Sequence, residues 1–225
     1  MNINSKLIIV VILIFLSVSF IQADDTIKPG LNFLKSAIVP GWGQLSLDKN
    51  YGYGFLLAEA SFWTMRFYYL QETDNNAQAS YNYARQFADV DPQGHFPNQF
   101  YEDMRNYSNS GYNTGGYNAH IVAEAANKYP DDPLAQQTYI DANIYDETHY
   151  WSWSSDEDQS RYSNYRRNID LYKDYLKLVG GVIAANHIIG AIDALRLSNH
   201  LKHVRLGVDT NSDHVPLLTC TIKFK

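Results

Sequence analysis

The chain has 225 residues, a formal net charge of −6 and a single cysteine. The negative balance leaves no basic surface to neutralise nucleic-acid phosphates, so no nucleic-acid partner is expected. The lone Cys220 excludes a disulfide within one chain. Stability must therefore come from packing, for which 18 tyrosines, 10 phenylalanines and 4 tryptophans supply large apolar areas with polar tips.

The N-terminus has the pattern of a secretory signal peptide. Lys6 gives a positive start, an apolar run covers residues 7–20, and Ala23 offers a small residue before an acidic pair. We expect residues 1–23 to be removed during export. The alternative is an uncleaved membrane anchor, although the apolar run is shorter than a usual span. The sequence thus predicts an exported protein of the periplasm or of the membrane-associated cell envelope.

Two helical segments are expected next. Apolar spacing predicts a short amphipathic helix over residues 31–39, and Pro40 ends it. A sharp turn follows, in which the Trp42 ring would anchor the chain in an apolar layer. A second helix is predicted over residues 54–70. It is apolar nearly all round, yet Glu59 and Arg66 lie on one of its faces.

The middle of the chain, residues 71–155, is a polar insertion rich in tyrosine. Residues 71–176 hold 17 acidic and 7 basic side chains, so the basic residues concentrate in the flanks. We find no repeat period and therefore expect no solenoid. Turn signals separate short predicted helices within the insertion, at 77–87, 117–128 and 133–144. The helical domain as a whole is expected to cover residues 24–202.

A long helix is predicted to follow the insertion. Ser154 and Glu157 fit a capping box, and helical spacing continues from there to residue 199. The pair Gly180 and Gly181 predicts a bend or a flexible point within this helix.

The second half of this helix, residues 178–195, is apolar and rich in small residues. We expect it to pair with residues 54–70 as an antiparallel helical hairpin. In that arrangement Glu59 would lie close to His187, and we predict a hydrogen bond between them. Three polar residues interrupt the segment and need partners if they are buried: Asn186, His187 and Asp193.

The C-terminal residues 203–225 change period. Apolar residues alternate there with polar or small ones on both sides of a turn at 209–213, which predicts a β-hairpin with one apolar face. A lone hairpin is marginal in water, so it must cover a helix, pair with another strand or touch lipid. The predicted fold class is therefore mainly α: an antiparallel apolar helical hairpin with a Tyr-rich helical insertion and a C-terminal β-hairpin.

Two interpretations of the apolar helices stay open, a membrane-spanning pair and a soluble or peripheral core. Residues 178–195 are a borderline span and residues 54–70 fall short of one. Each charge at mid-bilayer costs about 2.5–3.5 kcal/mol, so Glu59 and Arg66 weigh against a helix exposed to lipid. Two spans after a cleaved signal would also put the acidic middle in the cytoplasm, against the positive-inside tendency. The sequence favours the soluble or peripheral core.

Signals for catalysis are weak, and no catalytic residue, metal site or cofactor is predicted. Residues 209–220 imitate the start of a calcium loop but lack its required glycine and glutamate. His200 and His203 lie one helical turn apart without a third strong ligand at fixed spacing.

An aromatic cluster closes the insertion. Tyr150, Trp151 and Trp153 could stack on sugar rings, or they could form a core plug or an interfacial anchor. The second interpretation is favoured, because large aromatic residues usually serve packing.

Two motifs resemble a known family. Residues 36–44 read Ser-Ala-Ile-Val-Pro-Gly-Trp-Gly-Gln, and residues 186–194 read Asn-His-Ile-Ile-Gly-Ala-Ile-Asp-Ala. They resemble the SAxxPGxGQ and NHxxxAIDA segments of a family of bacterial envelope proteins catalogued as a domain of unknown function (domain of unknown function 5683). The resemblance implies an N-terminal signal and membrane association, and it implies no activity. The chain departs from the family pattern at residues 45–50, where a tyrosine–asparagine–glycine turn is usual.

These observations predict a non-enzymatic, membrane-associated scaffold or adaptor that docks on a membrane surface or an envelope protein assembly. The alternative is a periplasmic binding module for a lipid, peptide or glycan. The candidates for ligand binding or interaction come from the two motifs, the helical pair and the aromatic cluster: Trp42, Gln44, Glu59, Arg66, Tyr150, Trp151, Trp153, Asn186, His187 and Asp193.

Overall fold

The computed structural model describes residues 27–210 and 216–222, and the side chains of residues 27–201. The predicted signal peptide lies outside this range. Most of the described chain is helical, which confirms the mainly α fold class. The chain forms two compact units. The terminal unit joins the residues up to Tyr69 with those from Tyr175 onward, and the central unit is Leu70–Asp174.

The terminal unit begins with two short helices, α2 (Pro29–Ile38) and α3 (Trp42–Leu45). Proline is favoured at the first position of α2, since its missing N–H would have no partner there. Gly41 turns the chain between the helices with φ +94°, in the left-handed region that favours glycine. A Cβ at this position would also collide with the carbonyl oxygen of Gly52.

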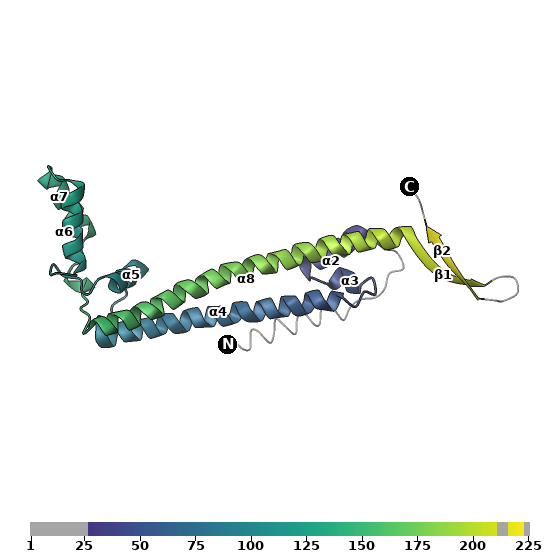
Figure 1. The fold of residues 1–225 in the computed structure, drawn as a ribbon, viewed down its shortest axis with the longest axis horizontal. Helices are drawn as coiled ribbons and strands as arrows, with labels where there is room; N and C mark the ends of the chain where they lie inside the picture. The colour runs from purple at the N-terminus through teal and green to yellow at the C-terminus, as the bar shows by residue number, and fades with distance from the viewer. Residues whose placement is uncertain (1–26, 211–215, 223–225) are drawn as a thin grey trace. The chain divides into compact units, whose positions relative to one another are not determined.

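Two long helices, α4 (Gly52–Phe87) and α8 (Asp156–His203), contribute to both units. In the terminal unit they lie side by side and run in opposite directions (Figure 1). Phe55, near the start of α4, accepts a hydrogen bond from Asn186 of α8. Further along α4, Arg66 Nη1 donates to the carbonyl of Leu176, which lies earlier in α8. Later residues of α4 therefore contact earlier residues of α8, as expected for antiparallel helices.

Both long helices differ from the prediction in detail. The predicted helices at 54–70 and 77–87 are one helix, because the residues between them include neither glycine nor proline and Asn76 bonds back to the carbonyl of Glu72. Helix α8 continues through the Gly180–Gly181 pair. Its capping residue is Ser155, whose hydroxyl accepts from the backbone N–H of Asp158 at 3.1 Å.

Within the described range, two segments after α8 pair in an antiparallel manner, β1 (Val204–Thr210) and β2 (Pro216–Ile222). Val204 lies opposite Ile222, and Thr210 lies opposite Pro216. The turn residues and the strand side chains lie outside the described range. The apolar face of the hairpin therefore stays a prediction.

The central unit has an aromatic core. Trp151 is fully buried, and its Nε1 donates to the carbonyl of Tyr107 at 3.1 Å. Trp153, 9% exposed, donates to the carbonyl of Met104 at 2.8 Å. The elements around this core include α5 (Asn98–Asn106), α6 (Tyr117–Lys128), α7 (Pro133–Asn143) and the 3-10 turn η1 (Glu147–His149). Helix α5 was not predicted, while α6 and α7 lie where the turn signals placed them.

Partly buried tyrosines link these elements through a hydrogen bond and a ring contact. Tyr145 donates to Asp103 Oδ2 at 2.7 Å, and the Tyr117 ring lies 4.6 Å from the Tyr145 ring. Burial, followed by the hydrogen bond to Asp103, raises the pKa of Tyr145. Burial, followed by the nearby charge of Asp103, raises the pKa of Tyr117 to about 12. The folded state thus holds these phenolic protons more tightly than the unfolded chain does.

We predict that the central unit loses stability at high pH. A raised folded-state pKa contributes stability that is fully present below the unfolded value, about 10, and that is lost as the pH rises toward the folded value. The melting temperature of the full chain, followed by near-ultraviolet circular dichroism, should be flat from pH 7 to 9 and fall between pH 10 and 12. Tyr145→Phe should start lower and decline less steeply. Equal slopes for the two proteins would contradict this origin.

Candidate functional site

The interior of the terminal unit is polar. Where α2, α3, α4 and α8 meet, several polar side chains are less than one-tenth exposed: Asn32, Ser36, Gln44, Glu59, Asn186 and Ser198. Buried polar groups need hydrogen-bond partners, because each unpaired one costs about 1–3 kcal/mol. These side chains find their partners in one another and in nearby backbone groups. We call this set, together with His187 and Asp193, the polar interior.

The centre of the polar interior is the carboxylate of Glu59, which is 4% exposed. Its Oε1 accepts from Trp63 Nε1 at 2.7 Å, and its Oε2 accepts from Asn186 Nδ2 at 2.9 Å. His187 Nε2 lies 3.1 Å from Oε1, which confirms the predicted contact between Glu59 and His187. Three side chains from two helices thus converge on one carboxylate.

The second ring nitrogen of His187 extends this cluster to α2. His187 Nδ1 lies 2.8 Å from the carbonyl oxygen of Ala37, and a carbonyl oxygen can only accept. Nδ1 therefore carries a hydrogen, while Nε2 faces a carboxylate oxygen. A further proton must lie between Nε2 and Glu59 Oε1, so the pair is either an imidazolium with a carboxylate or two neutral groups. Both forms have zero net charge and join α2, α4 and α8.

A second cluster joins the two sequence motifs. Gln44 Nε2 donates to the carbonyl of Gly190 and to Asp193 Oδ2, both at 2.9 Å. Its Oε1 accepts from Ser36 at 2.7 Å, so the amide is used at both ends. Tyr51 also donates to Asp193 Oδ2, at 2.8 Å. Residues 36–44 and 186–194 therefore lie together at the junction of the apolar helices, as expected from a turn at the start of the helical hairpin and polar groups on its partner helix.

Close backbone packing explains a glycine of the first motif. A Cβ at Gly43 would collide with the carbonyl oxygen of Asn32 and lie 2.8 Å from the Cβ of Ala194. The backbone N–H of Gly43 donates to the hydroxyl of Ser36 at 2.8 Å. The small residues thus let α3 approach α8 closely enough for Gln44 to reach its partners.

Two candidates have weaker positions in this arrangement. Arg66 Nη1 lies 3.5 Å from the carbonyl oxygen of Leu176, at the far end of the helical pair from Gln44. Trp42 is half-buried, and its buried Nε1 has no hydrogen-bond partner within the described part of the chain. Neither side chain contributes a hydrogen bond to the polar interior.

The aromatic candidates belong to the central unit and do not join the polar interior. Trp151 and Trp153 lie in the core with their ring faces covered, so their proposed role in stacking on a ligand is wrong and the core alternative is correct. The Phe100 ring, 5.2 Å from the Trp151 ring, and the Tyr162 ring, 4.9 Å from the Trp153 ring, occupy space that a sugar would need. Tyr150 alone of the three is exposed.

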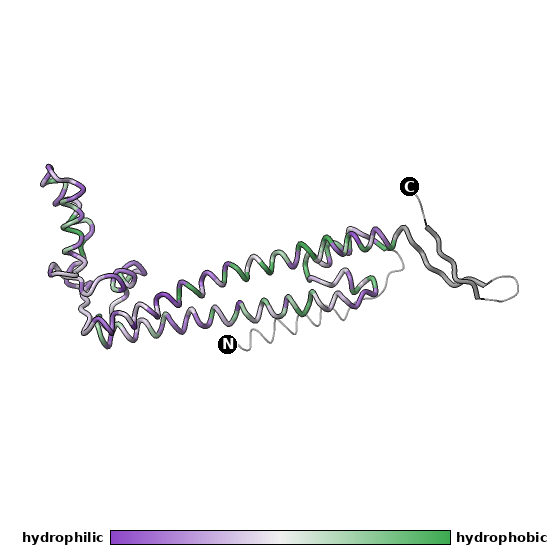
Figure 2. The backbone as a smooth tube through the Cα atoms, viewed as in Figure 1, coloured by the Kyte–Doolittle hydropathy of each residue, from purple (hydrophilic) through white to green (hydrophobic). Residues whose placement is uncertain are grey.

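The exterior of the terminal unit is apolar. Figure 2 shows hydrophobic residues gathered along the part of α8 that belongs to this unit. Between Leu178 and Ile192, α8 has no Asp, Glu, Lys or Arg. Exposed apolar side chains lie on all three longer helices: Leu31, Leu34 and Ile38 on α2, Leu57 and Met65 on α4, and Leu178, Val182, Ile188, Ile189 and Ile192 on α8. The terminal unit thus has polar side chains inside and many apolar side chains outside, the reverse of a water-soluble domain.

One helix of the described chain, α8, is long and apolar enough to cross a membrane by length and composition, and only 28% of its most apolar 18-residue window is buried. Exposed tyrosines flank the apolar exterior at both ends. Tyr51 and Tyr53 lie at the start of α4. Tyr68 and Tyr175 lie at the opposite end, where the rings of Tyr69 and Tyr175 are 5.1 Å apart.

A shallow recess opens on the flank of α4. It has a volume of about 280 Å³ and is lined by Tyr51, Gly54, Phe55, Ala58 and Asn186. The small residues Gly54 and Ala58 are one turn apart and leave room between the rings of Tyr51 and Phe55. Asn186 connects the recess to Glu59 in the polar interior.

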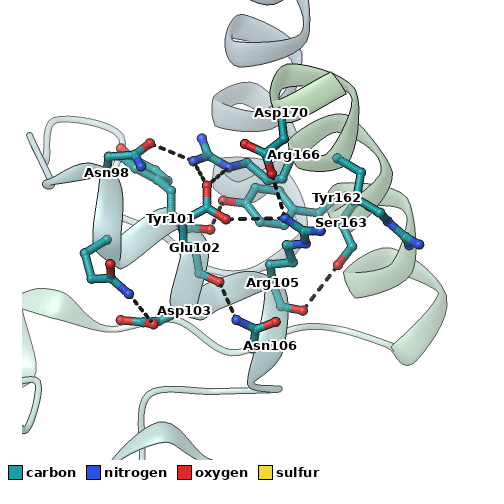
Figure 3. Close-up of polar contacts among 12 residues, drawn as sticks. Asn98, Tyr101, Glu102, Asp103, Arg105, Asn106, Tyr162, Ser163, Arg166 and Asp170 are labelled. Carbon is teal, nitrogen blue, oxygen red and sulfur yellow. Dashed lines mark hydrogen bonds and ion pairs between the residues drawn. The ribbon is translucent and has the colours of Figure 1, made fainter. Parts of the chain in front are cut away.

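The central unit has its own buried charge, which sequence reasoning missed. Figure 3 shows Arg166 of α8 between Asn98 and Glu102 of α5. Its side chain is 2% exposed, with Nε 3.1 Å from Glu102 Oε1 and Nη2 2.7 Å from Asn98 Oδ1. Glu102 also pairs with Arg105, which reaches Asp170 at 3.0 Å. The ionic contacts cross-link α5 to α8.

A signal for Arg166 was present in the sequence. It lies four residues after Tyr162 and three before Ile169, both of which are buried, so helical spacing puts it on the buried face. An arginine there requires a carboxylate partner. The pair was missed because α5, which supplies the partner, is a short and mostly polar helix that was not predicted.

Among the residues the structure describes, no group of three or more His, Cys, Asp or Glu side chains is placed to hold a metal ion. The chain was also compared with known proteins. No family model, curated protein or solved structure matches it. The function must therefore be argued from the geometry, and the resemblance to the envelope family stays an expectation based on two motifs.

We predict that Glu59→Ala strongly destabilises the terminal unit. The substitution leaves three donors without an acceptor, and removing one partner of a buried ionic cluster costs roughly 3–5 kcal/mol. The melting temperature of the purified full chain should fall by many degrees. Ser61→Ala, two residues along on the exposed face of α4, should change stability by about 0.5 kcal/mol or less. Similar losses from the two variants would contradict the central role of Glu59.

A neighbouring pair of arginines tests the contact between α5 and α8. Arg166→Ala removes the buried guanidinium that bonds Glu102 and Asn98, while Glu102 keeps its contact with Arg105, so we expect a loss of roughly 1.5–3 kcal/mol and faster hydrogen exchange at the amides of α5. Arg167→Ala removes an exposed side chain of the same type and should leave exchange unchanged. Unchanged α5 exchange in Arg166→Ala would show that the ion pair does not hold this helix.

Proposed function

We propose that the terminal unit is embedded in a membrane, and that the protein is a non-enzymatic, membrane-anchored scaffold or adaptor of the cell envelope. The observation that carries this proposal is the reversed polarity of the unit. Contiguous exposed apolar surface is rare on soluble monomers, where it marks contact with lipid or protein. In lipid, polar groups must instead find partners inside the protein, and the polar interior fulfils this condition.

The main objection to two spans concerned the charges of α4, and the side-chain directions weaken it. Glu59 points into the polar interior and is 4% exposed, so it presents no charge to lipid. Arg66 lies near one end of the apolar exterior, where a long side chain reaches the interface. Mean hydropathy over the whole helix counts both charges as if they faced lipid. It therefore underestimates how apolar the lipid-facing side of α4 is.

Dimensions agree with a bilayer. Residues 178–195 of α8 extend about 27 Å at 1.5 Å per residue, close to the roughly 30 Å hydrocarbon core. On α4, Tyr53 and Tyr68 are separated by about 22 Å, with the apolar exterior between them. Tyrosine is enriched at both membrane–water interfaces because its ring is apolar and its hydroxyl is polar. The flanking tyrosines thus correspond to interfacial anchors.

The position of the α2–α3 turn supports the same conclusion. Ala37 contacts His187, and the Pro40 side chain lies next to Gly190, so the turn reaches well into the apolar length of α8. Non-helical backbone at membrane depth is tolerated only where protein covers it. Pro40 and Gly41 are buried. The element therefore fits a re-entrant hairpin, with the exposed apolar residues of α2 facing lipid.

The central unit supplies the part in water. It has an aromatic core and an acidic, polar surface, as expected for a domain that contacts other components outside the bilayer. Its Arg166 and Glu102 neutralise each other, so this buried charge supports a structural role. A scaffold or adaptor accounts for both units: one anchors the chain and the other presents a folded surface.

Two exposed apolar residues, one in each unit, test membrane embedding. With Cys220 changed to Ser, Ile188→Cys and Leu134→Cys would each carry a single thiol, at positions 60% and 78% exposed on the protein. In open membrane fragments, we expect a water-soluble maleimide to label Leu134→Cys at least about tenfold faster, because lipid covers position 188. The anchored chain should also resist alkaline carbonate extraction. Equal labelling rates together with carbonate release would overturn the proposal.

A further inference from the structure

The recess on α4 offers hydrogen-bond acceptors and no free donors. Asn186 Nδ2 donates to the carbonyl of Phe55 at 3.2 Å and to Glu59 Oε2 at 2.9 Å, so both amide hydrogens point inward. The hydroxyl hydrogen of Tyr51 is directed to Asp193. What remains at the recess is Asn186 Oδ1 and the Tyr51 oxygen, and both accept. A ligand that bonds here must bring the donors.

The surroundings favour a positively charged donor. Each polar lining residue donates to a carboxylate, and a hydrogen bond to a charged acceptor polarises the donor group and strengthens its remaining acceptor. No basic side chain pairs with Asp193 within the described residues, so its charge is offset only by the neutral groups of Gln44 and Tyr51. The rings of Tyr51 and Phe55 form the walls, and aromatic faces attract cations.

The place of the recess in the proposed membrane orientation selects a source for this ligand. Tyr51 belongs to the tyrosines at one end of the apolar exterior, which is the level of the lipid headgroups in the proposed function. Gly54 is exposed, and a Cβ built on it would meet nothing within 4 Å, so the recess opens outward toward lipid. Its 280 Å³ accommodates a small headgroup.

We propose that this recess binds a phospholipid whose headgroup ends in a primary ammonium, as in phosphatidylethanolamine. The ammonium would donate to Asn186 Oδ1 and the Tyr51 oxygen and lie against the Tyr51 and Phe55 rings. A quaternary choline headgroup has the same charge and no N–H donor. It could make the cation–π contact with the two rings, but it would leave both acceptors without a hydrogen bond. The proposal rests on the membrane location of the terminal unit.

Native mass spectrometry of the purified full chain in detergent tests this selectivity. The chain would be mixed with equal amounts of phosphatidylethanolamine and phosphatidylcholine of identical acyl chains. Hydrogen bonds to a charged group are worth about 1.5–3 kcal/mol, so a preference of about tenfold or more for phosphatidylethanolamine is expected. Equal occupancy by the two lipids, or no retained lipid, would overturn the headgroup site. Membrane embedding would still be decided separately by the labelling and carbonate tests.

A pair of glycines gives matched variants. Gly54→Leu fills the recess without a clash, and it should abolish the preference. Gly181→Leu adds the same side chain to α8 at a second exposed glycine with nothing within 4 Å, away from the recess, and it should keep the preference. Retained selectivity in Gly54→Leu, or its loss in both variants at unchanged helicity, would contradict the assignment. The preference of the unmodified chain decides the proposal even if a variant fails to fold.

Discussion

The terminal unit depends on a carboxylate that is taken out of solvent. Glu59 can be buried because Trp63 and Asn186 donate hydrogen bonds to it and His187 shares a proton with it. Burying an ionised group without such partners costs several kcal/mol, so the cluster permits only the register of α4 against α8 that brings all the donors together. His187 passes the constraint to α2 through the carbonyl of Ala37. One polar residue in an apolar helix thereby determines how the helices meet, and apolar packing alone would permit many registers.

The two units solve the problem of burial in opposite ways. In the central unit, rings of tryptophan, tyrosine and phenylalanine fill the core and bury only the polar groups that they can pair, such as the indole N–H of Trp151 with the carbonyl of Tyr107. In the terminal unit polar groups share the interior with Val179 and small residues, while many leucine and isoleucine side chains face outward. The hydrophobic effect drives the first arrangement in water. In the second, hydrogen bonds and close approach of small residues hold the helices together, as in membrane proteins. The proposed function, a membrane anchor joined to a water-exposed domain, accommodates both arrangements.

The two motifs can be explained by this packing. One side of the contact is formed by Ser36, Gly43 and Gln44, and the other by Gly190, Asp193 and Ala194. Glycine stands where a side chain would collide. A side-chain amide or hydroxyl stands where a backbone group needs a hydrogen-bond partner. The same polar groups have a consequence at the surface. Because Asn186 donates its hydrogens to Phe55 and Glu59, and Tyr51 donates its hydrogen to Asp193, the recess on α4 presents acceptors to its surroundings. The structural junction and the proposed site for a donor headgroup therefore depend on the same hydrogen bonds.

The sequence by itself determined the helical class, the apolar segments and the pairing of Glu59 with His187, because helical periodicity and the need of a buried carboxylate for a partner are local and chemical facts. Periodicity could not tell that α4 continues unbroken to Phe87, since polar residues 71–76 weaken the apolar pattern without breaking the helix. Three-dimensional contacts alone decided that Trp151 and Trp153 are core residues, that Glu102 neutralises Arg166, and that apolar residues of α8 face outward. Mean hydropathy sums over all the residues of a helix and does not record where each side chain points. Only the tertiary structure therefore shows which face of α4 and α8 is polar. That direction distinguishes a membrane anchor from a soluble core.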